Sequence, residues 1–186
     1  WVAHHRMHHA GSDTERDPHN AKDSLWWAHL GWMLYKHPEF DNEKTVQNYS
    51  KDISDNKFYQ FLEKNYIKNQ FVLGFIFLAI GGLPWVVWGI FLRLVLVYHG
   101  TWFVNSATHA FGYKNFQLGN DLSTNCWWVA ILAYGEGWHN NHHAFPKSAQ
   151  HGLRPMELDL TWMAIWTLKK MGLAKNIRVA KVKRSL

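Results

Sequence analysis

The 186-residue sequence predicts an all-α integral membrane protein, a helical bundle with one transmembrane hairpin and a cytoplasmic helical cap that holds a histidine-rich metal site. Two observations support this prediction. Between Lys68 and Lys114 the only charged residue is Arg93, and such a stretch is too long and apolar for an ordinary core helix. The pattern HxxHH also occurs twice, as His5, His8, His9 and as His139, His142, His143.

Length and composition fit a single domain over residues 1–186. Lys+Arg number 20 against Asp+Glu 14, a formal net charge of +6, which suits an anionic membrane surface or an acidic partner better than nucleic acid. Because Cys126 is the only cysteine, an intrachain disulfide and a Cys-rich metal site are excluded. The chain begins at Trp1, close to the first histidine cluster, so we expect it to be a fragment.

Before the membrane segment the elements are short. Residues 1–9 are predicted to be the end of a helix, followed by a polar loop over residues 11–20. Residues 25–34, rich in tryptophan, predict a short apolar or interfacial helix. Ser54 is predicted to cap a further helix that lies on the membrane surface.

Residues 69–106 are predicted to form the transmembrane hairpin. Gly81–Pro84 is a turn signal, with proline well placed to begin the second helix. Lysines flank both ends of the hairpin and its tip has none, so the positive-inside rule puts both histidine clusters on the cytoplasmic side. The alternative is one long membrane span followed by a buried core helix.

After the hairpin, residues 127–134 predict an apolar helix, and residues 136–146 carry the second histidine cluster. Leu158, Trp162, Ile165 and Trp166 form an amphipathic stripe near the C-terminus. We expect the basic tail that follows, over residues 175–184, to be solvated or to face lipid.

The two histidine clusters are predicted to share metal. Residues at i, i+3 and i+4 lie on one face of a helix, so each HxxHH supplies half of a site. Neither cluster contains the glutamate of a zinc-protease HExxH, which makes a metallohydrolase less favoured. Six or seven imidazoles exceed what one tetrahedral zinc binds, so they suggest two metal ions. Redox chemistry at iron fits that number, although imidazole also suits zinc.

Four further residues are candidates near these clusters. Asn105 and His109 are spaced i and i+4 at the end of the second membrane helix, where the alternatives are a helix cap or an interhelical hydrogen bond. Asp17 and Glu136 are predicted to orient imidazoles through their second ring nitrogens, with capping or surface roles as the alternative.

Four ordered motifs resemble those of the membrane-bound fatty acyl desaturase family. They are HRMHH at 5–9, DPHN at 17–20, NSATH at 105–109 and GEGWHNNHH at 135–143. The resemblance covers essentially the whole chain and is strongest to the delta-9 branch of the cyanobacterial and plastid acyl-lipid type. It implies a di-iron enzyme that uses O2 to introduce a cis double bond into a saturated acyl chain.

The resemblance also implies roles for individual residues and partners. It implies two Fe2+ ions held by His5, His8, His9, His109, His139, His142 and His143, with Asn105 contacting metal through water. Thr101 and Trp102 match residues that line the acyl tunnel. The implied substrate is a lipid-bound acyl group, with an acyl-CoA as the less favoured alternative. The implied electron donor is ferredoxin or cytochrome b5. The implied location is a plasma or thylakoid membrane of the cyanobacterial type.

The family also carries an HxxxxH box and a first membrane hairpin before HRMHH, and both are missing from this chain. We therefore expect the fragment by itself to have no catalytic activity. Two alternatives stay open. A related membrane hydroxylase or alkane monooxygenase shares the histidine architecture, and a metal-binding membrane protein without catalysis would also fit the clusters.

Overall fold

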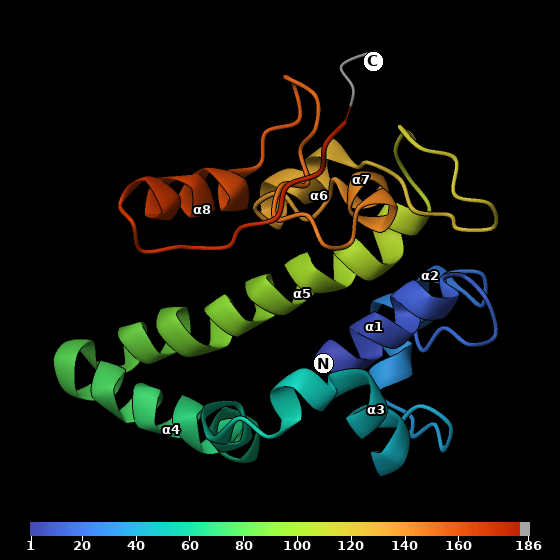
Figure 1. Ribbon diagram of the computed structural model, residues 1–186. Helices are drawn as coiled ribbons and strands as arrows, with labels where there is room; N and C mark the ends of the chain where they lie inside the picture. Colours follow the sequence, from blue (N-terminus) through green and yellow to red (C-terminus); the bar gives the residue numbers. More distant parts are fainter. Residues whose placement is uncertain (183–186) are drawn as a thin grey trace. The chain divides into compact units, whose positions relative to one another are not determined.

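A computed structural model describes residues 1–182, and in that part of the chain it contains helices and no β-strand (Figure 1). The predicted all-α fold class is therefore confirmed. The chain divides into two compact units: the first contains Trp1–Arg6 and His37–His99, and the second contains Met7–Lys36 and the chain from Gly100 onward. Helices α1 (Val2–Gly11) and α5 (Arg93–Ser106) each run from one unit into the other.

The first unit contains α3 (Glu43–Ser54), α4 (Lys57–Val86) and the π-helical segment η2 (Val87–Leu92). The predicted cap at Ser54 is wrong. Ser54 is the last residue of α3, a helix that was not predicted from the sequence. The side chain of Asn56 caps α4 instead, accepting from the Phe58 backbone N–H at 2.9 Å. Serine and asparagine are both favoured N-cap residues, so the sequence alone did not show which of the two precedes the helix.

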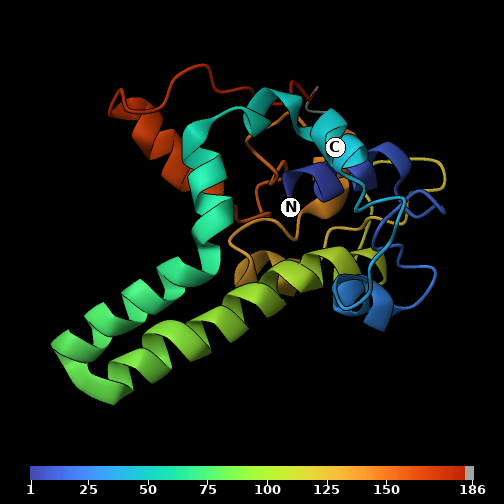
Figure 2. The same cartoon turned by 90° about the horizontal axis from the view of Figure 1, so that it is seen from below.

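Within this unit the chain reverses direction at the expected glycine-proline turn. Gly82 adopts φ 67° and ψ −164°, a conformation open to glycine, and it interrupts α4. The returning segment runs beside α4 (Figure 2). Arg93 donates to the side-chain oxygen of Gln70 at 2.7 Å, and the ring of Phe77 occupies the space beside Gly89. That this reversal is a hairpin crossing a membrane stays a prediction.

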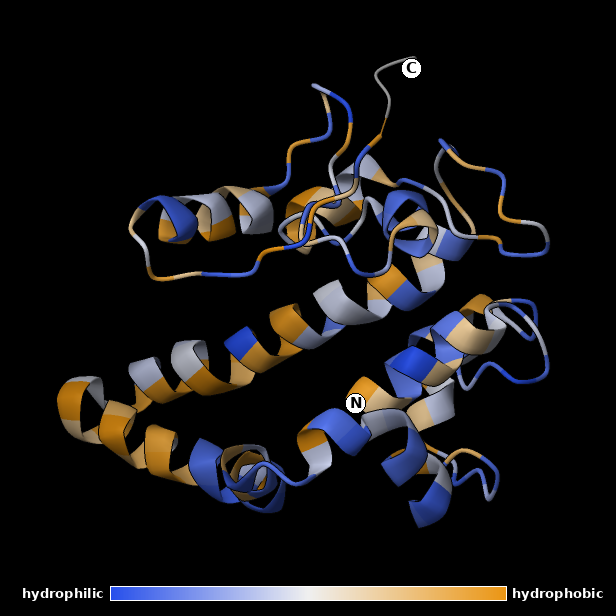
Figure 3. Ribbon diagram, in the orientation of Figure 1, coloured by the Kyte–Doolittle hydropathy of each residue, from blue (hydrophilic) through white to orange (hydrophobic). Residues whose placement is uncertain are grey.

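The helical stretch Lys57–His109 is long and apolar enough to span a membrane. No residue of α4 is buried, and large apolar side chains such as Phe75 at 68% and Leu83 at 70% exposure lie on its surface. Figure 3 colours much of α4 as hydrophobic. Because water does not favour so large an apolar surface, the stretch supports membrane association. Among the described residues one such stretch is found, rather than two separate spans.

The second unit contains α2 (Leu25–His29), η1 (Gly31–Met33), η3 (Ala107–His109), α6 (Trp127–Leu132), α7 (His139–Ala144) and α8 (Leu160–Lys170). The single helix expected over residues 25–34 is broken at Leu30, where φ is −135°. The ring of Trp26 packs onto Gly31, where a Cβ atom would lie 2.4 Å from it. The break is thus linked to a close contact that a sequence pattern does not reveal.

The apolar core of the second unit is small. It consists of Val104, Ala107, Cys126 and Val129, with Phe103 and Trp128 packed against it. The other buried side chains of this unit are mostly polar, and they include His8, His139, Asn125, Asn140 and Asn141. Buried polar groups are costly unless they are paired, so this unit is organised around polar contacts rather than a large hydrophobic core.

Candidate metal centre

Four histidines of the second unit converge on one point. The ring nitrogens of His8, His109, His139 and His143 lie within 4.8 Å of one another. The Nε2 of His143 is 3.2 Å from that of His8 and 2.9 Å from that of His139. Four imidazoles at this spacing can hold a metal ion, and we call these residues the four-histidine cluster.

A second pair lies beside this cluster. The Nε2 atoms of His9 and His142 are 2.8 Å apart, and the His9 ring lies 4.4 Å from that of His143, centroid to centroid. Within the second unit the structure therefore brings together six of the predicted histidines. His5 lies on α1 but in the first unit, where its ring stacks on Trp1 at 5.2 Å, and its role as a ligand stays a prediction.

Three elements supply these side chains. His8 and His9 come from α1, His109 ends the short helix η3, and the remaining histidines come from α7. In each HxxHH the spacing places the imidazoles on one side of a helix, as the sequence indicates. The two motifs meet although His8 and His143 are 135 residues apart.

Aspartates hold the outer nitrogen of three cluster histidines. Asp17 lies 2.7 Å from Nδ1 of His8, and Asp13 lies 2.9 Å from Nδ1 of His109. Asp121 lies 2.6 Å from Nδ1 of the third histidine, His143. A carboxylate at Nδ1 fixes the tautomer, so that Nε2 carries no proton and presents its lone pair to the cluster.

The donor set fits a bound cation. Nε2 of His109 is buried and has no hydrogen-bond partner within the described part of the chain. Lone pairs that converge from several imidazoles repel one another, and a positive ion between them removes that cost. Burial lowers the pKa of His139 well below its usual value and also lowers that of His143. Both imidazoles are therefore neutral, which is the form that binds metal.

The pKa values of the aspartates fit this arrangement in two of three cases. Burial is the largest single influence and opposes the ionisation of Asp121 and Asp13. The hydrogen bonds and charge interactions with His143 and His109, added to hydrogen bonds from Ser123 and Leu122, together outweigh burial and lower both pKa values. For Asp17 burial dominates, and the pKa is raised. The first two carboxyl groups are thus ionised, the state in which they accept from Nδ1–H most strongly.

Two asparagines inside the second motif fix the position of α7. The side-chain oxygen of Asn140 accepts from the backbone N–H groups of Asn115 and Phe116, each at 2.8 Å. Asn141 accepts from Asn115 and donates to the carboxylate of Glu157, both at 2.8 Å. Because these residues lie between His139 and His142, their bonds set the orientation of the helix that carries three histidines.

The glycines before α7 permit a close backbone approach. A Cβ atom on Gly137 would lie 2.1 Å from the backbone nitrogen of Ala130 in α6. Gly135 has φ 122°, and a Cβ there would meet the carboxylate of Asp159. The GEG sequence therefore brings α7 against α6 in a way that no larger residue allows.

The roles predicted for the remaining candidate residues are either untested or not supported. Asn105 is half-buried on α5, four residues before His109, and its contact with metal through water stays a prediction. Thr101 and Trp102 are half-buried on the same helix, and their place in an acyl tunnel is likewise untested. Glu136 lies 3.4 Å from His151, so it pairs outside the cluster rather than with a cluster histidine. The expectation that it orients a ligand is not supported.

The roles of Asp13 and Asp121 were not predicted from the sequence. Asp121 offered a signal, because it is the only acidic residue between Glu63 and Glu136. An isolated acid in a stretch that also carries His109 is a reasonable partner for an imidazole. Asp13 offered none, since its pairing with His109 spans 96 residues and depends on the fold.

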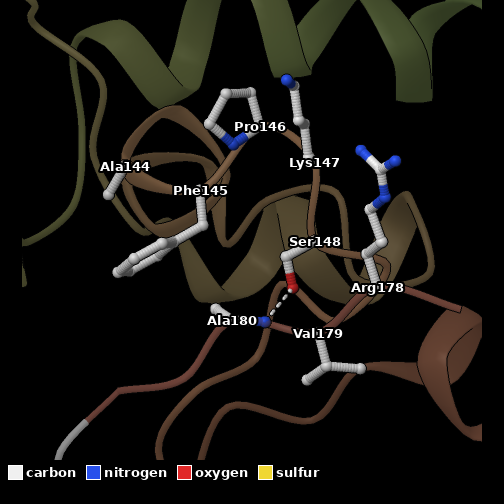
Figure 4. Close-up of a pocket in the computed structure, with 8 residues that line it drawn as sticks. All are labelled: Ala144, Phe145, Pro146, Lys147, Ser148, Arg178, Val179 and Ala180. Carbon is white, nitrogen blue, oxygen red and sulfur yellow. Dashed lines mark hydrogen bonds between the residues drawn. The ribbon is translucent and has the colours of Figure 1, made fainter.

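Two of the cavities lined by described residues belong to the second unit. One, of about 280 Å³, is mainly apolar and is lined by Leu25, Trp26, His29, Phe103, Ser106, Ala107, Phe111 and Trp128. Ala107 shares the short helix η3 with His109, so this cavity is adjacent to the four-histidine cluster along the chain. The second cavity lies between residues 144–148 and residues 178–180, with the Lys147 and Arg178 side chains pointing the same way at its edge (Figure 4).

Comparison with known proteins identifies the family. Residues 1–164 match the fatty acid desaturase family. The chain belongs to the fatty acid desaturase family. It is 56% identical over 179 residues to an sn-1 stearoyl-lipid 9-desaturase of Synechocystis sp., and 52% identical over 184 residues to an sn-1 stearoyl-lipid 9-desaturase of Anabaena variabilis. An sn-2 palmitoyl-lipid 9-desaturase of Nostoc sp. is 44% identical over 178 residues.

These alignments cover 96%, 99% and 95% of this desaturase-family chain. They cover 55%, 66% and 62% of the three relatives, so the chain spans less than two thirds of their length. Membership of the family and the histidine clusters together indicate a metal site. The family and the apolar helical stretch together indicate membrane association.

Proposed function

We propose that this chain is the metal-holding part of an oxygen-dependent acyl-lipid delta-9 desaturase. The observation that carries the proposal is the meeting of six histidines from the two HxxHH motifs and His109, three of them with aspartate at Nδ1. The proposed ligands are those six together with His5, binding two iron ions, with Asn105 acting through water. Family membership supports this assignment.

The chain's own residues would hold and orient the metal rather than react. Iron, when bound, would supply the oxidising power that breaks an unactivated C–H bond with O2, which side-chain acids and bases do not have. Asp13 and Asp121 keep Nε2 of His109 and His143 unprotonated and directed inward, and Asp17 holds the His8 ring through its Nδ1. Asn140 and Asn141 hold α7 in place, so the ligand geometry does not depend on the metal alone.

The proposed substrate is a saturated acyl chain carried on a membrane lipid. An apolar cavity beside η3 supports an acyl substrate, because hydrocarbon binds in cavities of this character. Thr101 and Trp102, on α5 near the same helix end, are proposed to line the path of the chain. The three relatives are named as lipid 9-desaturases, which supports a lipid-bound acyl group and the 9 position.

The electron donor is proposed to be ferredoxin or cytochrome b5, acting on the cytoplasmic side. Lys147 and Arg178 beside the second cavity support an acidic protein partner, since opposite charges favour encounter and docking. Phe145, which lines that cavity, follows His143 by two residues, so a donor bound there would approach the end of α7.

The test is product analysis in a desaturase-deficient host that expresses the protein from its complete gene. Gas chromatography of cellular fatty acids is expected to show a new cis unsaturated product, with the double bond at the 9 position. His142→Ala is expected to abolish that product. His4→Ala is the matched control, because His4 lies on α1 and pairs with Asp41, and it is expected to retain the product.

The outcomes separate the alternatives. A hydroxylated acyl product would favour a membrane hydroxylase or alkane monooxygenase instead. Bound iron with no altered lipid would favour a metal-binding protein without catalysis. Full activity and iron content in His142→Ala would overturn the proposed ligand set.

A further inference from the structure

Helix α8 exposes apolar side chains on the side away from its own unit. Thr161, Trp162 and Ile165 are half-buried and form its inner side, and α8 has no fully buried residue. The exposed apolar residues are Leu160 at 39%, Met163 at 53%, Trp166 at 49% and Leu168 at 43%. A surface helix in water places charged and polar residues on its outer face, so α8 departs from the usual pattern.

The apolar surface continues beyond both ends of the helix. Leu158 before it and Met171 and Leu173 after it are also exposed, at 54%, 64% and 70%. Leu160, Met163, Thr167 and Met171 follow the helical repeat, so they lie along one outer side, and three of these four residues are apolar. An exposed apolar strip of this length is typical of a binding surface rather than of a solvated one.

The charges at the end of α8 are all positive. Lys169 and Lys170 occupy its last turn, and the sequence from Leu160 to Leu186 contains no acidic residue. The ammonium group of Lys170 lies over the ring of Trp166, 5.2 Å from its centroid. Tryptophan and lysine side by side are typical of the layer where lipid headgroups meet hydrocarbon.

The fold holds α8 firmly at its start. Asp159 caps α8: its Oδ1 accepts from the backbone N–H of Trp162. Its Oδ2 accepts from the backbone N–H groups of His151 and Gly152. The backbone N–H of Thr161 donates to the carbonyl of Tyr134 at 2.8 Å. The strip is therefore presented by a positioned element rather than by a loose tail.

We propose that α8 lies in the headgroup layer of an anionic bilayer, with its apolar strip towards the acyl chains and Lys169 and Lys170 at the phosphates. Its 11 residues extend about 16 Å, too short for the roughly 30 Å hydrocarbon layer, so it lies along the surface and does not cross. The pairing of an apolar strip with lysines favours anionic lipid over an acidic protein, whose docking would not need so much exposed hydrocarbon. The inference rests on the membrane association of the proposed function, not on its chemistry.

The test places a fluorescent label on the strip. Met163→Cys, in a Cys126→Ala background, is labelled with an environment-sensitive fluorophore in the protein produced from its complete gene and reconstituted into vesicles. Gln117→Cys is the matched control, because Gln117 is an exposed polar residue of the same unit. We expect a blue-shifted emission at position 163, severalfold weaker quenching by iodide than at position 117, and quenching by spin-labelled lipid.

Charge provides the second arm of the test. Raising the fraction of phosphatidylglycerol in phosphatidylcholine vesicles is expected to strengthen the shift at position 163, and Lys169→Glu with Lys170→Glu to weaken it. Aqueous emission and full iodide quenching at position 163 in anionic vesicles would overturn the proposal. Protection that appears only with rising protein concentration, or only on adding ferredoxin or cytochrome b5, would overturn it in favour of a protein partner.

This test and the test of the proposed function fail separately. Fatty acid analysis reports the chemistry, whereas the label reports the position of α8. A wild-type chain that yields no unsaturated product and still shows the lipid signature at position 163 would retain this inference. An active chain whose label remains in water would lose it.

Discussion

At the scale of single residues, the centre depends on pairs of imidazole and carboxylate that come from distant parts of the chain. Asp13 and His109 are 96 residues apart, and Asp121 and His143 are 22 apart. The HxxHH spacing allowed the histidines to be predicted, because helical periodicity is local. Most of the partners of those histidines were not predictable, because pairing across loops depends on the tertiary fold.

The Asp121 carboxylate is expected to strengthen metal binding through His143. Asp121→Asn keeps the shape but removes the charge that favours the Nδ1–H tautomer, so metal affinity should fall by roughly 10- to 100-fold. Titration of the metal-free protein with Fe2+ under anaerobic conditions measures this. Asp23→Asn, at an exposed aspartate outside the centre, is expected to leave affinity unchanged. Equal affinity in Asp121→Asn and wild type would contradict this role.

Asn141 is expected to contribute to stability rather than to metal binding directly. Its side chain makes hydrogen bonds to Asn115, Asn125, His151 and Glu157. Asn141→Ala leaves several buried groups without partners, each costing about 1–3 kcal/mol, so the unfolding temperature should drop by several degrees. Differential scanning fluorimetry in detergent checks this against Asn48→Ala, an exposed position on α3. A similar Tm in both variants would show that the network is not needed.

At the scale of elements, the close approach of α6 and α7 sets where three histidines lie. Gly137→Ala places a Cβ atom 2.1 Å from the backbone of Ala130, so α7 must shift. We expect reduced iron content together with a lower Tm. Gly74→Ala is the matched control, because the nearest atom to its Cβ would be 3.9 Å away and alanine favours a helix. Normal iron content in Gly137→Ala would mean that this contact does not position the ligands.

The positions of elements were partly predictable from sequence. The turn at Gly81–Pro84 was anticipated because glycine and proline have strong local preferences, and Gly82 is where α4 breaks. The helix ends around Ser54 and Asn56 were not, because both residues are good caps. The break at Leu30 was missed because it accompanies the packing of Trp26 on Gly31.

At the scale of the whole molecule, metal is expected to stabilise the fold. Converging imidazoles repel one another without a cation, so binding free energy adds to folding free energy. Removing metal with a chelator should lower the Tm by roughly 5–10 °C, as a contribution of about 3 kcal/mol implies. Fe2+ should restore it. A Tm that is unaffected by chelation, with metal loss verified by elemental analysis, would contradict the coupling.

Two histidine motifs far apart in sequence were predicted to meet, and in the second unit the contacts of His8 and His9 with residues of α7 support that prediction. Two copies of the same ligand spacing predict a contact between distant segments, because three histidines alone supply only half of the proposed site. The crossing of the membrane stays a prediction, because hydrophobic length alone does not fix how a chain passes a bilayer.

Histidines from both motifs are proposed to bind iron together. Iron K-edge X-ray absorption of the purified protein, expressed from its complete gene, measures the atoms that coordinate the metal. We expect a first shell dominated by imidazole nitrogen, with the multiple-scattering pattern of histidine rings, that weakens in His143→Ala and persists in His4→Ala. A shell of oxygen or sulfur without imidazole scattering, or a protein that holds zinc in place of iron, would contradict it.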